Sequence, residues 1–400
     1  MNVETLTRTI LGNMPETTKW RRDFISKNFC LQCRLRGRHN FKNMSRYSEL
    51  NEGTFHNNYA KDFDFFEFNL HLLEEFGSSE RICAFDPSYI SKSGKCTPGL
   101  GYFWSGCAGK NKWGLEIGGF AAIDIINNTA MHLIADQTLA QKEHSNLLAY
   151  YADLVRFRSE ELKKVSDYLA ADAYFSRAPF VNAVLESGLD LISRLRDDGV
   201  LFYPYVGPQP KRKGAKTKYL GQVDPRNLDP AYFTCCIEDE GFRIYEATLY
   251  CKAFKRMIRV AVMHTYAEDG SIKKHKIFFS TDLSMSGIDI YCYYKGRYQI
   301  EFLYRDAKQH VGLEHAQTKS ETKLHFHFNT ALTTVSLAKA IYHLSQPIES
   351  RTPFSMADVK TQYFNELLWN KIICGCGLDP HQPKIIQLKQ KVLNFGKIRA

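Results

Sequence analysis

The segment from Arg81 to Asp172 constrains the fold most, because its apolar runs are arranged as three strands, one helix and a fourth strand. The predicted strands are Ile82–Asp86, Leu115–Ile125, Thr129–Gln137 and Val165–Asp172, and the predicted helix is Ser145–Val165. The first and fourth strands each end on an aspartate, Asp86 and Asp172. A carboxylate at the end of a buried strand is costly unless it binds a cation or faces a cleft. The alternative for Asp86 is a turn aspartate that precedes Pro87.

A second informative stretch is YKGRYQIEFLYRDAK, residues 294–308. We predict that it forms one helix, because apart from Gly296 it contains no helix breaker. At about 100° per residue, five side chains then share one face of the helix. These are Tyr294, Arg297, Glu301, Arg305 and Lys308. Ile300 and Leu303 point roughly the other way, where they can be buried.

The spacing Tyr-x2-Arg-x3-Glu-x6-Lys within this stretch resembles the YREK signature of a large group of bacterial insertion-sequence DDE transposases. Asp172-Ala-Tyr-Phe also resembles the short motif around the second aspartate of that family. The alternative is an ordinary solvated helix face with pairs such as Glu301 with Arg305.

The resemblance implies an α/β fold: an RNase H-like mixed sheet flanked by helices, interrupted by a β-rich insertion, with an N-terminal helical DNA-binding module. In an RNase H-like sheet the first and fourth strands are neighbours, so Asp86 and Asp172 would face each other. The implied catalytic and metal-binding residues are Asp86, Asp172 and Glu301. Carboxylates are hard oxygen ligands that suit Mg²⁺ or Mn²⁺. Two such ions about 3.5–4 Å apart can clamp a scissile phosphodiester.

The resemblance also implies contacts between basic side chains and DNA. Tyr294, Arg297 and Lys308 would hold phosphates at the transposon end, with Arg305 on the same face. A predicted strand, Leu191–Arg196, points Arg194 and Arg196 to one face, which either reaches DNA or is merely solvated. A basic loop in the insertion adds Lys211, Arg212 and Lys213.

Aromatic residues occur in two places where DNA could bind. The Gly- and Lys-rich connection Ser91–Lys112 and the adjoining Trp113 mix aromatics with lysines, which suits a DNA backbone or a loop packed over the sheet. The insertion contains the strand-like runs Tyr232–Ile237, Phe242–Tyr250, Arg256–Met263 and His275–Thr281. It has no tryptophan, whereas hairpin-forming members of the family are associated with one that stacks on a flipped base. That role is therefore absent here or falls to Tyr245, Phe254 or another aromatic.

Residues 1–75 are predicted to form a separate basic helical module. The first fifty residues carry ten Lys or Arg and four acidic residues. A short helix around Ser45–Leu50, a turn, and a second helix from Thr54 have the outline of a helix-turn-helix. The second helix would present to base edges His56, Asn57 and Asn58. The alternative is a small helical domain with a solvated basic face.

Composition limits the compartment and the partners. The formal net charge of +10 favours an anionic partner. We expect no membrane segment, because there is neither an N-terminal apolar region nor a run of about 18 apolar residues. The odd count of eleven cysteines suits reduced thiols in a cytoplasm. Two pairs, Cys30/Cys33 and Cys374/Cys376, lack second pairs at zinc-finger spacing, so we interpret them as ordinary thiols.

The predicted domains are residues 1–75, a catalytic core of 80–198 and 286–345, the insertion 199–285, and a helical tail 346–400. We interpret the sequence as a transposase that cleaves the ends of an insertion sequence and joins them to target DNA, using two divalent ions. The expected partners are double-stranded DNA (terminal inverted repeats and target) and a second copy of the chain, in a bacterial cytoplasm at the nucleoid. The alternatives are a catalytically inactive DNA-binding regulator and an RNase H-like nuclease that does not join strands.

Overall fold

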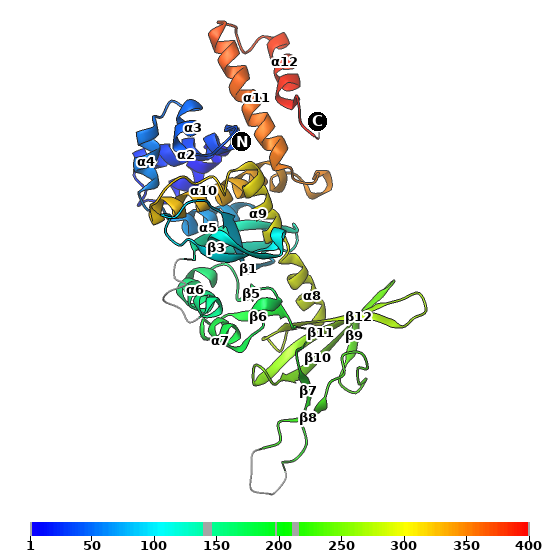
Figure 1. Ribbon diagram of the computed structural model, residues 1–400. Helices are drawn as coiled ribbons and strands as arrows, with labels where there is room; N and C mark the ends of the chain where they lie inside the picture. Colours follow the sequence, from blue (N-terminus) through cyan, green and yellow to red (C-terminus); the bar gives the residue numbers. More distant parts are fainter. Residues whose placement is uncertain (1, 139–145, 197, 210–215, 399–400) are drawn as a thin grey trace.

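The computed structural model describes residues 2–138, 146–196, 198–209 and 216–398. Within these residues all strands belong to one mixed sheet, and helices cover the half of it nearer the two termini (Figure 1). The strand order is β2-β3-β1-β5-β6-β12-β11-β10-β7-β8, with β4 on β3 and β9 on β10. The predicted α/β class, a mixed sheet flanked by helices, is confirmed.

Five of the strands in the half of the sheet near the candidate catalytic aspartates correspond to the core expected from the sequence. They are β1 (Arg81–Ser91), β3 (Lys110–Asp124), β4 (Thr129–Gln137), β5 (Tyr168–Ala170) and β6 (Asp190–Arg194). The strand β3 is antiparallel to β1 and β4, whereas β5 is parallel to β1 and β6. The first and fourth predicted strands, β1 and β5, are therefore neighbours, as the RNase H-like prediction requires. The prediction that the first strand ends at Asp86 is wrong, because β1 continues to Ser91.

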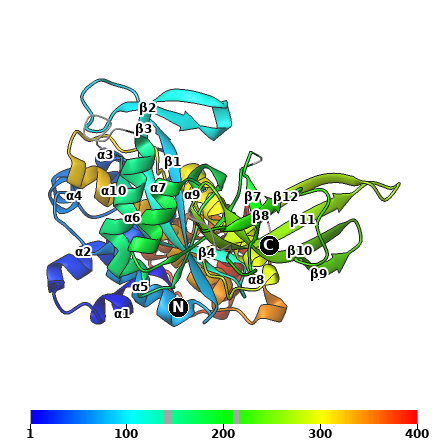
Figure 2. The ribbon, with the colours of Figure 1, turned by 90° about the horizontal axis from the view of Figure 1, so that it is seen from below.

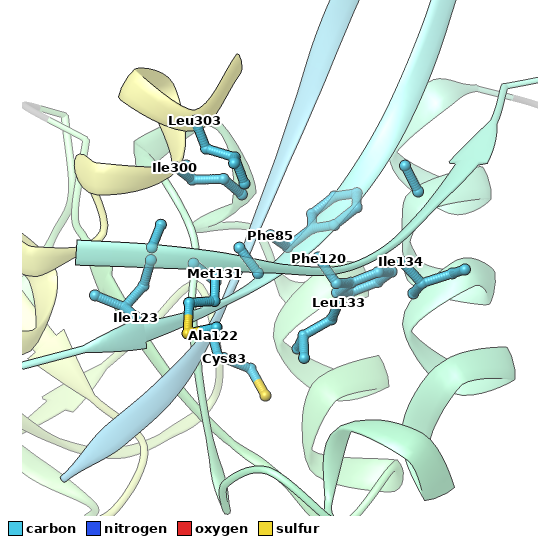
Figure 3. Packing of buried hydrophobic residues seen from close by; sticks show 14 of the residues in the cluster. Cys83, Phe85, Phe120, Ala122, Ile123, Met131, Leu133, Ile134, Ile300 and Leu303 are labelled. Carbon is cyan, nitrogen blue, oxygen red and sulfur yellow. The ribbon is translucent and has the colours of Figure 1, made fainter. Parts of the chain in front are cut away.

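Helices pack on both faces of these strands. On one face, Phe85 of β1 meets ring side chains of α6 (Leu147–Leu162) and α7 (Ala178–Glu186), with Tyr151 at 5.7 Å and Phe180 at 6.1 Å. Successive side chains of a strand point to opposite faces, so Asp86 faces away from these two helices. On that side lies α9 (Gln299–His310), whose Ile300 and Leu303 point toward the sheet and are buried as predicted (Figure 3).

The connection that follows β1 contains a strand that the sequence did not predict. The strand β2 (Gly101–Ser105) pairs with the first residues of β3, so β3 begins at Lys110 rather than at Leu115. A 3-10 turn, Gly106–Ala108, closes the hairpin. The β2–β3 hairpin projects beyond the body of the molecule (Figure 2).

The predicted insertion supplies the other half of the sheet. Its strands are β7 (Leu201–Pro204), β8 (Tyr219–Gln222), β9 (Thr234–Asp239), β10 (Phe242–Cys251), β11 (Arg256–Tyr266) and β12 (Ile272–Ser280). The four strand-like runs predicted there correspond to β9 through β12. Because β12 pairs with β6, the sheet passes from the core into the insertion without interruption. The domain boundaries at 199 and 285 therefore stay a prediction.

Five helices precede β1: α1 (Val3–Gly12), α2 (Lys19–Arg34), α3 (Phe41–Arg46), α4 (Glu52–Tyr59) and α5 (Phe65–Phe76). The predicted helix boundaries are wrong here, because α3 ends before Leu50 and Asn51, not Thr54, caps α4. The Asn51 side chain accepts the Thr54 N–H at 2.8 Å. The Tyr59 ring of α4 lies 4.4 Å from Phe326 of α10 (Glu321–Lys339). The N-terminal helices thus share a hydrophobic core with the rest of the molecule.

The chain after α10 forms a helical hairpin. A π-helical turn, Ala340–Leu344, extends α10. The hairpin consists of α11 (Met356–Gly375) and α12 (Pro383–Asn394), within the predicted helical tail 346–400, and it projects from the body (Figure 1). Tyr363 of α11 accepts the Val3 N–H, which ties the hairpin to α1. Of the helices in the described ranges, none is both long and apolar enough to cross a bilayer.

Candidate active site

The stretch that carries the Tyr-Arg-Glu-Lys spacing is two helices, not the single helix that we predicted. The helix α8 (Gly287–Gly296) ends at its glycine, and α9 begins at Gln299. Glycine in a helix interior costs about 1 kcal/mol relative to alanine, which favours a break there. The N–H of Ile300 bonds to Arg297 O and that of Glu301 to Tyr298 O, both at 3.1 Å. These are i−3 bonds, so a tight 3-10-like turn places Arg297 at the corner between the helices.

Arg297 lies among the three predicted acids. Its Nη1 is 3.6 Å from Asp86 Oδ1, and its Nη2 is 3.3 Å from Glu301 Oε1. Burial lowers the pKa of Arg297, but the charges of Asp86, Tyr294, Asp172 and Glu301 outweigh this and raise the pKa above its usual value. Carboxylates from β1 and α9 therefore contact one buried guanidinium, and the charge of Asp172, in the turn after β5, acts on it as well.

The surroundings of Asp86 strongly perturb its carboxyl group. Burial raises the pKa of its carboxyl to about 7, with Asp172 and Glu301 raising it further and Arg297 and Lys308 opposing them. Its side chain nevertheless keeps 20% of its surface exposed, so solvent reaches it. Crowded carboxylates at a solvent-accessible position favour binding of a cation.

The prediction that Asp172 ends the fourth strand is wrong. The strand β5 ends at Ala170, two residues before Asp172. The Asp172 Oδ1 accepts the Tyr174 N–H at 2.8 Å and so caps the 3-10 turn Ala173–Phe175. The Ser193 hydroxyl of β6 donates to the Asp172 backbone carbonyl at 2.9 Å. The position of this aspartate is therefore set by one hydrogen bond within its own turn and one from β6.

The donor set fits a divalent metal, although the carboxylates are not arranged as a finished metal site. Two aspartates and a glutamate provide the oxygen ligands that Mg²⁺ and Mn²⁺ prefer. Across the described residues, no three His, Cys, Asp or Glu side chains are grouped closely enough to hold a metal ion. Instead Arg297 lies between Asp86 and Glu301, and its buried Nε and Nη1 have no hydrogen-bond partner among the described residues.

Two of the other predicted DNA-contacting side chains on α8 and α9 lie beside the acids, and one does not. Tyr294 packs against Arg297, whose Cζ is 5.6 Å from the ring centroid. Burial raises the pKa of the Tyr294 hydroxyl. Lys308 donates to the Tyr89 backbone carbonyl at 2.7 Å and its charge acts on Asp86. Arg305 instead turns to its neighbour Asp306, at 3.1 Å, away from Glu301.

The basic residues predicted to contact DNA in and after β6 also differ in their surroundings. Arg194 ends β6, and its charge lowers the pKa of Tyr294 against the effect of burial, so Arg194 belongs to the same neighbourhood. Arg196 lies beyond the strand and pairs with Asp198 at 3.3 Å. The prediction that this strand continues to Arg196 is therefore wrong. The predicted loop residues Lys211, Arg212 and Lys213 lie outside the described residues.

The three predicted base-reading residues on α4 differ in their surroundings. His56 is exposed, and Lys323 of α10 donates to its ring, with Nζ 2.7 Å from Nε2. Asn58 is half-buried, and its carbonyl accepts from Arg21 Nη1 at 2.8 Å. Asn57 is exposed. Nothing in this arrangement brings α4 to the acids.

Tyr304 also contacts the site, and the sequence motifs did not indicate it. Its hydroxyl donates to the Asp86 backbone carbonyl at 2.6 Å. The one sequence signal was its position three residues after Glu301, which places the two side chains on neighbouring positions of a helix.

A family model described as "Transposase DDE domain" matches residues 83–337, a range that contains Asp86, Asp172 and Glu301 and more than half of the chain. No curated protein matches the sequence. The chain belongs to the transposases with a DDE domain.

Proposed function

We propose that this transposase cleaves the ends of an insertion sequence and joins them to target DNA, with Asp86, Asp172 and Glu301 as its catalytic carboxylates. The observation that carries the proposal is that the buried Arg297 contacts the carboxylates of Asp86 and Glu301, which come from separate elements, while the charge of Asp172 acts on the same guanidinium. A fold without a use for that cluster would be more stable with apolar residues there, because each buried charge costs free energy.

The three carboxylates would hold two Mg²⁺ or Mn²⁺ ions. Such ions, when bound, supply Lewis-acid stabilisation of the attacking and leaving oxygens of a phosphodiester. Arg297, Lys308 and Tyr294 would position the scissile strand, since they border the carboxylates and two of them are cationic. Holding the strand in line for displacement is a large part of catalysis of phosphoryl transfer.

DNA would approach across the side of the sheet that bears Asp86. Arg194 extends the basic border of the site toward the insertion. Lys110 and Lys112 lie in the first residues of β3, close to the exposed Trp104 and Trp113 of the projecting hairpin. Lysines alternating with exposed aromatics suit backbone contacts and base stacking. The net charge of +10 supports the same partner.

We further propose that the chain belongs to the YREK group, acts as a homodimer on DNA, and works at the bacterial nucleoid in the cytoplasm. Two inverted ends related by twofold symmetry match a dimer with twofold symmetry. The exposed Asn57 and His56 on α4 would read base edges in the terminal repeats.

The proposal is tested by incubating the protein with Mg²⁺, the DNA that flanks its own gene, and a supercoiled plasmid. The expected products are ends cut at the element boundary and ends joined to the plasmid, both dependent on Mg²⁺. Cut ends that never join would indicate a nuclease. Binding to the flanks with no cutting in Mg²⁺ or Mn²⁺ would contradict catalysis.

One observation favours a second candidate, a transposase-derived regulator that binds ends without cutting them. Arg297 lies where a cation would otherwise neutralise Asp86 and Glu301, so the carboxylates have a counter-charge without any metal. The incubation above separates the two functions, because a regulator gives protection of the ends and no cut.

A further inference from the structure

A buried contact beneath the catalytic carboxylates joins the two elements that carry Asp86 and Glu301. Tyr304 is 5% exposed, and its hydroxyl donates to the Asp86 backbone carbonyl at 2.6 Å. Tyr304 lies on α9 three residues after Glu301, which is about one helical turn. The bond therefore links the backbone of one carboxylate residue to the helix that presents another.

The strand beside Asp86 leaves room for this hydroxyl. In the β1–β3 ladder, Asp86 is paired with Gly119. A Cβ at position 119 would lie 2.0 Å from the Tyr304 hydroxyl oxygen and 3.1 Å from the ring atom that carries it. The first distance is impossible for unbonded atoms, whereas the second requires a shift of only a few tenths of an ångström. Only glycine fits opposite Asp86 while Tyr304 keeps its hydroxyl.

The hydroxyl is placed to donate at neutral pH. Burial raises the pKa of Tyr304 well above its usual value, and the charge of Asp86 acts in the same direction.

We propose that Tyr304 is a positioning residue that fixes the separation of Asp86 and Glu301, and that Gly119 is required because it admits the Tyr304 hydroxyl. The inference rests on the proposed function, in which those two carboxylates share bound metal. A displacement of about 1 Å between groups that must act together costs about a hundredfold in rate. Removing a group that orients a metal ligand typically lowers metal affinity or activity about 10–100-fold.

The test compares three full-length variants, Tyr304→Phe, Gly119→Ala and the double variant, with the wild type. Each is assayed for cleavage of the flanking-DNA substrate over a range of Mn²⁺ concentrations, for Mn²⁺ binding by calorimetry without DNA, and for melting temperature. We expect Tyr304→Phe to raise the half-saturating Mn²⁺ concentration about tenfold. Gly119→Ala should lower cleavage about a hundredfold or more.

The double variant is the decisive one, since removing the hydroxyl removes the collision with the new methyl group. It should recover to within about threefold of Tyr304→Phe, as expected when two changes act on one contact. Tyr363→Phe is the matched control, because it also removes a buried tyrosine hydroxyl bonded to a backbone group, here the Val3 N–H. It should leave the Mn²⁺ response unchanged.

Two results would overturn the inference. The first is a Tyr304→Phe protein with a wild-type Mn²⁺ response in both assays. The second is a double variant as impaired as Gly119→Ala alone, which would mean that the methyl group collides with something other than the hydroxyl. A wild-type protein that binds Mn²⁺ but never cuts would instead contradict the proposed function, and the calorimetric comparison would still decide the role of Tyr304.

Discussion

The guanidinium of Arg297 lies 3.6 Å from the carboxylate of Asp86, although one residue sits at the corner between α8 and α9 and the other in the middle of β1. Both side chains are largely withdrawn from solvent. Arg297 is therefore expected to have a second role besides binding phosphate. In the metal-free protein it also supplies the positive charge that lets the carboxylates lie close together.

Replacing Arg297 by Ala should destabilise the metal-free protein. Removing one partner of a buried ion pair costs about 3–5 kcal/mol, and we expect the lower end because Asp86 can take up a proton. Denaturant unfolding at neutral pH, with and without Mn²⁺, measures the effect, and Mn²⁺ should restore part of the loss. Arg305→Ala is the control, since Arg305 is half exposed and its ion pair is with the adjacent Asp306. Equal losses for the two variants would refute this role for Arg297.

The stability of the metal-free protein should fall as the pH rises through the range from about 4 to about 7. The pKa of Asp86 is raised to about 7, chiefly by burial, whereas an unfolded aspartate has a pKa of about 4. The folded state thus binds this proton more tightly, and its advantage is lost as the pH passes the folded pKa. Thermal melts from pH 5 to pH 8 measure the slope. Asp86→Asn should reduce the slope and raise the melting temperature at pH 8, whereas an unchanged slope would exclude Asp86 as its source.

The arrangement of β1 beside β5 could be predicted because the order of strands and helix resembles the RNase H-like fold, in which the first and fourth strands are neighbours. The strand β2 was missed because its partner residues at the start of β3 include Lys110 and Lys112, which interrupt any apolar pattern. The pairing of β12 with β6 leaves no local signal at all, since it is decided by packing between distant segments.

The candidate site was predictable in its residue types but not in its geometry. Tyr294, Arg297 and Lys308 still lie beside the acids despite the break at Gly296. The tight turn between α8 and α9 keeps the chain close to a helical path. The burial of Arg297 depends on carboxylates from other elements, so no helical angle could reveal it. Arg305 left the predicted face because Asp306 offers it a nearer partner.

Lys308→Ala should slow end cleavage by orders of magnitude. Lys308 is bonded to the Tyr89 carbonyl and its charge acts on Asp86, so it borders any strand that reaches the carboxylates. A phosphate contact predicts that the slope of log affinity for end DNA against log salt drops by about one. Lys295→Ala, an exposed lysine on α8, should leave the cleavage rate unchanged. A Lys308→Ala protein with a lower melting temperature but a wild-type cleavage rate would show that the lysine only ties α9 to β1.

Trp104→Ala should weaken binding to forked DNA with unpaired bases more than binding to plain duplex. Trp104 is 61% exposed on the projecting hairpin, so its ring is open to stacking with an unpaired base. Stacking on an aromatic side chain contributes about 1–3 kcal/mol per base. Fluorescence anisotropy with the two DNA forms measures the difference, and Phe157→Ala, a similarly exposed aromatic on α6, is the control. Equal weakening by both variants would argue against a specific surface on the hairpin.

The most direct test of the central claim is the cleavage rate of Asp172→Asn on flanking DNA in Mg²⁺. An asparagine oxygen can still accept the Tyr174 N–H, so the turn after β5 should persist while a charged ligand is lost. If the three carboxylates catalyse cleavage, cutting and joining should disappear while DNA binding and melting temperature stay close to the wild type. A variant that cuts and joins at the wild-type rate would contradict the account.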